Sequence, residues 1–160
     1  MEPATLAWLE ALAESDDVFT ARFGVPVVVG WAPSREAISF GLQAARDGAP
    51  PSWGVHLFFD DDGTLVGNGG WKGAPVDGTA ELGYGVAPER RRRGIATAAV
   101  RELVARARVA GVRLVIAHTR PEPSASTTVL DRCGFTRVGE LVDPEDGLMW
   151  RWELPLATPD

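Results

Sequence analysis

The chain has 160 residues, of which 45% are hydrophobic and 24% charged, which suits one compact α/β domain and is thin for two. A formal net charge of −6 argues against general affinity for nucleic acid and favours a cationic partner, such as an amine. A single cysteine, Cys133, and two distant histidines, His56 and His118, exclude a disulfide framework and a structural metal site.

The sequence shows neither a membrane-spanning segment nor a secretory signal. No run of about 18 apolar residues exists, which is the length needed to cross a bilayer. The first residues, Met1, Glu2 and Pro3, lack the basic and then apolar layout of a secretory signal. We therefore expect a cytoplasmic protein without membrane contacts.

The first third of the chain predicts helices. Leu6, Leu9 and Leu12 recur at helical spacing, so the chain is expected to start directly with a helix. Residues 15–17 offer N-caps for a second, short helix that Gly24 ends.

The connection that follows is less regular. Residues 25–31 form a short apolar run that fits an extended connector or a strand. Ser34 is expected to cap a further helix through about Arg46.

The middle of the chain predicts an antiparallel meander. Residues 53–59 and 65–71 flank the turn residues 60–63, which is typical of a β-hairpin. Residues 79–87 predict a third consecutive strand.

The second half mixes helices with strands. Residues 95–110 predict a helix and residues 113–119 a buried strand, which together with the preceding strand indicate a βαβ unit. Residues 125–133 predict a helix with Ser124 as N-cap, and residues 135–142 and 148–154 a closing hairpin.

The most informative segment is the loop before the helix at residue 95. Four arginines, residues 90–93, end at Gly94, where a helix N-terminus would present unpaired N–H groups and the positive end of its dipole. Gly94 and Ala96 leave room for a pyrophosphate near the main chain. A solvated charged loop is the alternative for any arginine run. The glycine patterns of Rossmann and P-loop sites are absent, and the strand–loop–helix placement favours an anion site.

This segment resembles motif A of the GNAT N-acetyltransferases, Arg/Gln-x-x-Gly-x-Gly/Ala. The match is carried by Arg91, Gly94 and Ala96. More closely, the chain resembles the branch that includes the ribosomal-protein N-terminal acetyltransferases. The similarity covers roughly residues 52–154 and continues through residues 81–84, 117–119, 125–135 and 143–147.

The resemblance implies the α/β (α+β) fold of that family. One domain would span residues 1–160, with a mixed, mostly antiparallel central sheet that splays between its fourth and fifth strands and is flanked by helices. Residues 1–50 would form a helical acceptor-side region, and residues 52–154 the cofactor-binding core.

The resemblance also implies acetyl-coenzyme A as acetyl donor, and we expect no metal. The pantetheine arm would pair with the main chain of the fourth strand, and the pyrophosphate would meet the N–H groups that open the helix. Ser124 stands near the place where relatives often carry an asparagine that contacts the arm. The cofactor-binding residues expected on this basis are Val86, Ala87, Arg91, Arg92, Arg93, Gly94, Ile95, Ala96, Thr97 and Ser124.

Acetyl transfer needs a neutral amine, and a free alkylamine has a pKa near ~10, so a base is useful. Glu81 matches the family's carboxylate, with a surface strand carboxylate as the alternative, and a main-chain N–H near Val86 would meet the oxyanion. Many relatives protonate the leaving thiolate with a tyrosine where this chain has Leu130, and Ser126 is the nearest polar substitute. His118 is a second possible base, although a structural role is favoured for it.

Two functions from different classes remain open. The first is an N-acetyltransferase that moves the acetyl group directly onto a small-molecule amine or a peptide N-terminus. The second is a non-catalytic acyl-CoA sensor, an idea supported by the missing tyrosine and by the departure at Pro123 and Ser124. Nucleic-acid contact through the arginines is disfavoured by the acidic net charge. Homodimers are common in the family, so a homodimer is a possible assembly.

Overall fold

The computed structural model describes residues 1–32 and 35–157. The chain divides into two compact units that interleave in the sequence. Unit 1 comprises Met1–Trp71 and Tyr84–Ile95, and unit 2 comprises Lys72–Gly83 and Ala96–Asp160.

Unit 1 begins with a strand. β1 (Glu2–Pro3) pairs antiparallel with β2 (Val55–Phe59), and β2 pairs antiparallel with β3 (Leu65–Trp71). The predicted hairpin is therefore confirmed. The expectation that the chain starts directly with a helix is wrong, because a strand of two residues is too short to leave a periodic pattern.

The segment that follows the second helix runs beside β3. Val27 forms a parallel bridge with Leu65, the N–H of Val28 donates to the carbonyl of Leu65 over 3.0 Å, and the N–H of Leu65 donates to the carbonyl of Pro26 over 2.8 Å. This extended connection supplies one bridge and not a full strand.

The described residues of unit 1 form three α-helices, α1 (Leu6–Glu14), α2 (Asp16–Phe23) and α3 (Glu36–Arg46). The hydroxyl of Ser15 accepts from the N–H of Val18, and Gly24 ends α2 with a left-handed φ of 67°, as predicted. The predicted cap Ser34 lies outside the described residues.

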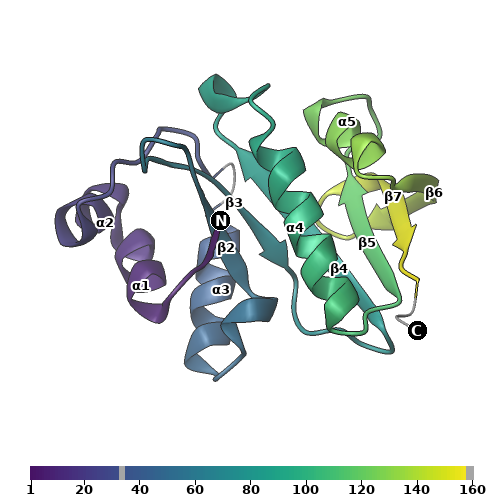
Figure 1. Ribbon diagram of the computed structural model, residues 1–160, viewed down its shortest axis with the longest axis horizontal. Helices are drawn as coiled ribbons and strands as arrows, with labels where there is room; N and C mark the ends of the chain where they lie inside the picture. The colour runs from purple at the N-terminus through teal and green to yellow at the C-terminus, as the bar shows by residue number, and fades with distance from the viewer. Residues whose placement is uncertain (33–34, 158–160) are drawn as a thin grey trace. The chain divides into compact units, whose positions relative to one another are not determined.

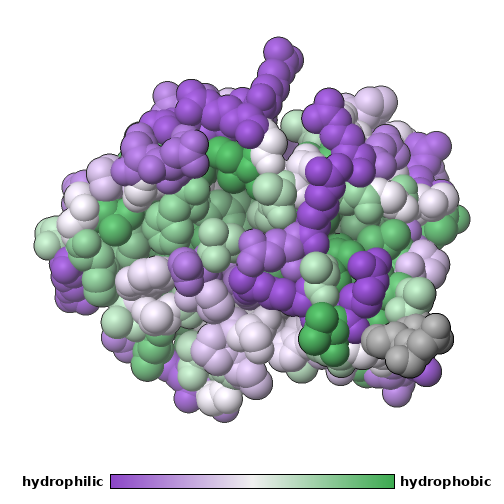
Figure 2. Space-filling view, viewed as in Figure 1, coloured by the Kyte–Doolittle hydropathy of each residue, from purple (hydrophilic) through white to green (hydrophobic). Residues whose placement is uncertain are grey.

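The core of unit 1 forms between these helices and the hairpin. Its largest fully buried side chains include those of Phe19, Trp31 and Leu57. The apolar faces of α1 and α2 are used only in part, since Leu6 and Phe23 remain exposed. Figure 2 shows hydrophobic surface over these two helices.

Unit 2 contains the predicted βαβ arrangement. β4 (Thr79–Val86), which also reaches into unit 1, pairs parallel with β5 (Leu114–Thr119), and α4 (Ile95–Val109) connects them. The ladder runs from Thr79 opposite Leu114 to Glu81 opposite Ile116.

The end of the chain closes the sheet. After α5 (Ala125–Arg132), β6 (Thr136–Asp143) and β7 (Gly147–Pro155) form the predicted hairpin, and β7 pairs with β5 (Figure 1). The strand order is β1-β2-β3-β4-β5-β7-β6, so the predicted mixed, mostly antiparallel sheet with flanking helices is confirmed. In the described part of the chain, every helix is too short or too polar to cross a bilayer.

Candidate functional site

The loop predicted to bind an anion belongs mostly to unit 1. It follows a short 3-10 turn at Pro88–Arg90 and ends where α4 begins at Ile95. Arg92 and Gly94 both have left-handed φ angles, of 64° and 76°. A Cβ atom on Gly94 would meet no other atom within 4 Å, so the space beside this residue is open.

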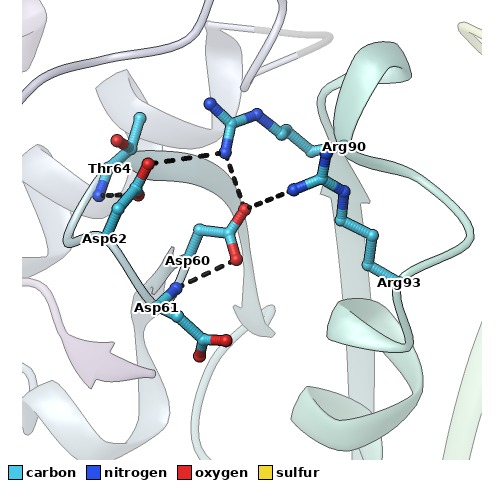
Figure 3. Close-up of polar contacts among 6 residues, drawn as sticks. All are labelled: Asp60, Asp61, Asp62, Thr64, Arg90 and Arg93. Atoms are coloured by element: carbon cyan, nitrogen blue, oxygen red, sulfur yellow. Dashed lines mark hydrogen bonds and ion pairs between the residues drawn. The ribbon is translucent and has the colours of Figure 1, made fainter.

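Two of the four arginines are held by an acidic turn. Asp60 is the first residue of the β2–β3 turn, and its Oδ2 is 2.7 Å from Arg90 Nη1 and 3.1 Å from Arg93 Nη1 (Figure 3). Arg90 Nη1 also lies 3.9 Å from Asp62 Oδ2. The arginine run is thus anchored to the hairpin, which fixes the start of the loop.

The main-chain N–H of Asp61 and the guanidinium of Arg90 hold the pKa of Asp60 below its ordinary value, and the charge of Arg93 adds to the effect. Hydrogen bonds from Thr64 likewise lower the pKa of Asp62. Both carboxylates are therefore ionised at neutral pH and form ion pairs with the arginines.

Replacing Asp60 with asparagine is expected to lower the free energy of unfolding at neutral pH. The folded pKa of Asp60 lies below the unfolded value of about 3.9, so its contribution is present above that value and is lost as the pH falls through the folded pKa. Urea titrations from neutral pH down to about pH 3 should show the difference between Asp60→Asn and wild type shrinking.

The control is Asp61→Asn, which removes a neighbouring carboxylate that makes none of the ion pairs drawn in Figure 3. Equal effects of the two substitutions at neutral pH would show that the ion pairs of Asp60 do not stabilise the loop.

The other residues expected to bind the cofactor lie at the end of β4, in the loop and in the first turn of α4. Arg91 Nε donates to the carbonyl of Val86 over 3.2 Å, which ties the loop to the end of β4. The N–H of Ala87 donates to the carbonyl of Val66 over 2.8 Å, so this N–H already has a partner. Ile95, Ala96 and Thr97 form the half-buried first turn of α4.

A charged cluster in unit 2 surrounds Glu81. Its Oε1 lies 2.8 Å from Lys72 Nζ and 2.8 Å from His118 Nδ1. Burial alone would raise the pKa of Glu81, but the hydrogen bonds from Lys72 and His118 outweigh it and leave the pKa below its ordinary value. Glu81 is therefore an ionised, anchored carboxylate.

The elements beside this cluster carry further charges. His118 lies opposite Arg151 of β7, and Arg151 Nε donates to Glu153 Oε1 over 2.9 Å. The N–H groups of Asp146 and Glu145 lower the pKa of Asp143, with smaller contributions from the charges of Lys72 and His118. Glu81, Lys72 and His118 thus form the cluster, and Asp143, Arg151 and Glu153 lie on the neighbouring strands β6 and β7.

The residues predicted on α5 have mainly local roles. The hydroxyl of Ser124 accepts from the N–H of Thr127 over 3.3 Å, and the N–H of Ser124 donates to Thr127 Oγ1 over 2.8 Å, which makes a capping box. Ser126 is half-buried in the first turn, and Leu130 is fully buried.

Sequence reasoning missed Lys72 and Asp60. The hairpin register offered a signal for Lys72, because its N–H donates to the carbonyl of Glu81 and opposite charges across a strand pair attract. No local signal connects Asp60 with Arg90.

Among residues 1–32 and 35–157, no group of three or more histidine, cysteine, aspartate or glutamate side chains could hold a metal ion.

A family model for the acetyltransferase (GNAT) domain matches residues 1–136. The chain belongs to the GNAT acetyltransferase family. A comparison with curated protein sequences finds no significant match.

Solved structures show the same fold. A ribosomal-protein-alanine N-acetyltransferase from Brucella melitensis is 24% identical with a TM-score of 0.64, over 97% of this chain and 98% of that one. A ribosomal-protein-S5-alanine acetyltransferase from Vibrio fischeri is 14% identical with a TM-score of 0.68, over 96% and 91%. A GNAT-family acetyltransferase from Bacillus anthracis is 21% identical with a TM-score of 0.53, over 59% of this chain, which spans 61% of that one.

Proposed function

We propose that the chain is an acetyl-coenzyme A-dependent N-acetyltransferase that moves the acetyl group directly onto a primary amine. The observation that carries the proposal is the carboxylate of Glu81, anchored 2.8 Å from both Lys72 Nζ and His118 Nδ1. An amine enters such a reaction as an ammonium ion and must lose a proton before it can attack. Glu81 on β4 stands where the family carries its base, and its pairing with the imidazole of His118 on β5 supports proton removal.

The loop at Gly94 supports donor binding. The left-handed residues Arg92 and Gly94 form a tight turn before the N-terminus of α4, and such turns can point successive N–H groups toward an anion. We assign the diphosphate of acetyl-coenzyme A to this loop and the pantetheine arm to Val86. The proposed donor contacts are those of Arg91, Arg92, Arg93, Gly94, Ile95, Ala96 and Thr97, with Ala87 and Ser124 in supporting positions.

Direct transfer is favoured over an acyl-enzyme by the state of Cys133. Burial raises the pKa of its thiol, which donates to the carbonyl of Thr97 over 3.8 Å. A thiol with a raised pKa is a poor nucleophile at neutral pH. We propose Ser126, which lies in the first turn of α5, as a weak proton donor to the leaving thiolate.

The acceptor is proposed to be a peptide N-terminus or a small-molecule amine. The net charge of −6 suits a cationic acceptor, and two of the similar structures are named for acetylation of a ribosomal-protein alanine. The test is thiol release from acetyl-coenzyme A with peptides that begin with alanine, with polyamines and with amino acids. Absence of turnover with every amine, despite binding of acetyl-coenzyme A, would favour the non-catalytic sensor.

Replacing Glu81 with glutamine is expected to lower kcat roughly tenfold while the Kd for acetyl-coenzyme A stays the same. The rate falls because the amide has no negative charge to assist removal of the proton. The Kd stays the same because the amide keeps the shape of the side chain. Calorimetry gives the Kd and a thiol assay gives kcat. A sensor would show no loss of rate to measure, because only an enzyme depends on the carboxylate for turnover.

The matched control is Glu153→Gln. Its side chain is 27% exposed against 25% for Glu81, it lies in the same sheet, and it is also paired with a cation. Equal losses of kcat in the two variants would show that the charge of Glu81 has no special part in the reaction.

A further inference from the structure

The two ring nitrogens of His118 have different surroundings. Nδ1 lies 2.8 Å from Glu81 Oε1. Nε2 is buried and has no hydrogen-bond partner among the residues that the structure describes. Buried polar atoms are nearly always hydrogen-bonded, so an exception in a functional cluster requires an explanation.

The charge of Glu81 determines where the ring carries its hydrogen. The pKa of Glu81 is lowered, so the group is ionised at neutral pH and can only accept hydrogen bonds. Nδ1 must then be the donor, and the neutral ring keeps its lone pair on Nε2. Lys72 Nζ donates to the same oxygen over 2.8 Å, which holds the carboxylate in this orientation.

Glu81 itself is a poor proton acceptor in this setting. Its Oε1 already accepts from two donors, and both hydrogen bonds favour the ionised form. Imidazoles are in general stronger bases than carboxylates by about 2 pKa units. A base is most effective when its basicity matches the working pH.

Charges of both signs lie around His118. Glu81 on β4 and Asp143 on β6 stabilise a positive ring, whereas Lys72, after β3, and Arg151 on β7 oppose it. The contact with Glu81 is the direct one. With Nδ1 engaged by Glu81, Nε2 is the ring nitrogen that has a lone pair for a proton.

We propose that Nε2 of His118 accepts the proton of the acceptor ammonium and that Glu81 is a positioning residue, an inference that rests on the proposed acetyl transfer. One ammonium proton goes to Nε2 and is later released to solvent. The amine nitrogen then forms a bond to the acetyl carbonyl carbon, and the C–S bond breaks with its electron pair on sulfur. A second proton leaves the nitrogen and ends on the thiol, and the third stays on the amide.

The test compares His118→Asn with Glu81→Gln. The asparagine amide can still donate to Glu81 from the place of Nδ1, but it has no basic nitrogen at the place of Nε2. We expect kcat to fall at least about 100-fold with unchanged Kd for acetyl-coenzyme A, against a roughly tenfold loss for Glu81→Gln. The deficit should shrink as the pH approaches about 10, where the amine loses its proton to solvent unaided.

Three outcomes overturn the inference. His118→Asn with kcat within about threefold of wild type would make the ring structural, and a loss in Glu81→Gln as large as that in His118→Asn would make Glu81 the base. Wild-type protein without turnover on any amine would remove the proposed function and the inference with it. Should His118→Asn fail to fold in thermal unfolding, His118→Gln is the second variant, because it also lacks a basic nitrogen, and Glu153→Gln is the control.

Discussion

Replacing Gly94 with aspartate should weaken acetyl-coenzyme A binding at least about 100-fold relative to replacement with asparagine. Both residues tolerate the left-handed conformation better than other side chains, and the space beside Gly94 is open, so both variants should fold. They differ by one negative charge at the proposed diphosphate site. Like charges 4 Å apart repel by about 4 kcal/mol at an effective dielectric constant of 20, which exceeds the energy of a 100-fold change. Calorimetric titration with acetyl-coenzyme A measures the difference.

Gly48 provides the matched control for this experiment. It has a φ of 83°, and a Cβ there would also meet nothing within 4 Å, but it follows α3 and lies outside the arginine loop. Gly48→Asp and Gly48→Asn should bind acetyl-coenzyme A with equal affinity. If Gly94→Asp and Gly94→Asn also bind it equally well, the diphosphate does not lie beside this residue.

Replacing Trp31 with alanine should reduce the free energy of unfolding by about 3–5 kcal/mol. Trp31 is 1% exposed and is among the largest fully buried side chains of unit 1. Its Nε1 also donates to Asp16 Oδ1 over 3.2 Å, and Arg35 Nη1 binds the same oxygen over 3.1 Å. The substitution therefore removes buried apolar surface and a link between the loop after α2 and the start of that helix.

Urea denaturation followed by circular dichroism measures this loss, with the m-value as a check on cooperativity. Trp31→Phe is the informative companion, because it keeps an aromatic ring in the core and removes the N–H together with part of the ring volume, so it should cost about 1–3 kcal/mol. A cost below about 1 kcal/mol for Trp31→Ala would mean that the loop after α2 is not packed on the core.

Local structure was predictable where a few neighbouring residues determine it. Ser15 and Ser124 cap helices as predicted, because a hydroxyl there satisfies N–H groups two or three residues away. The hairpin around residues 60–63 followed from the change to alternating residues and its turn chemistry. The two-residue β1 was missed, because so short a strand has no pattern and forms only by pairing with β2.

The family was predictable from the sequence itself, since motif A places Arg91, Gly94 and Ala96 within six consecutive residues. Only the tertiary structure decided how the charged groups pair. Asp60 meets Arg90 across 30 residues, and Glu81 meets His118 across 37. Such pairs depend on the register between strands and on the path of loops, which periodicity does not encode. For this reason the structure, and not the sequence, distinguishes the two nitrogens of His118.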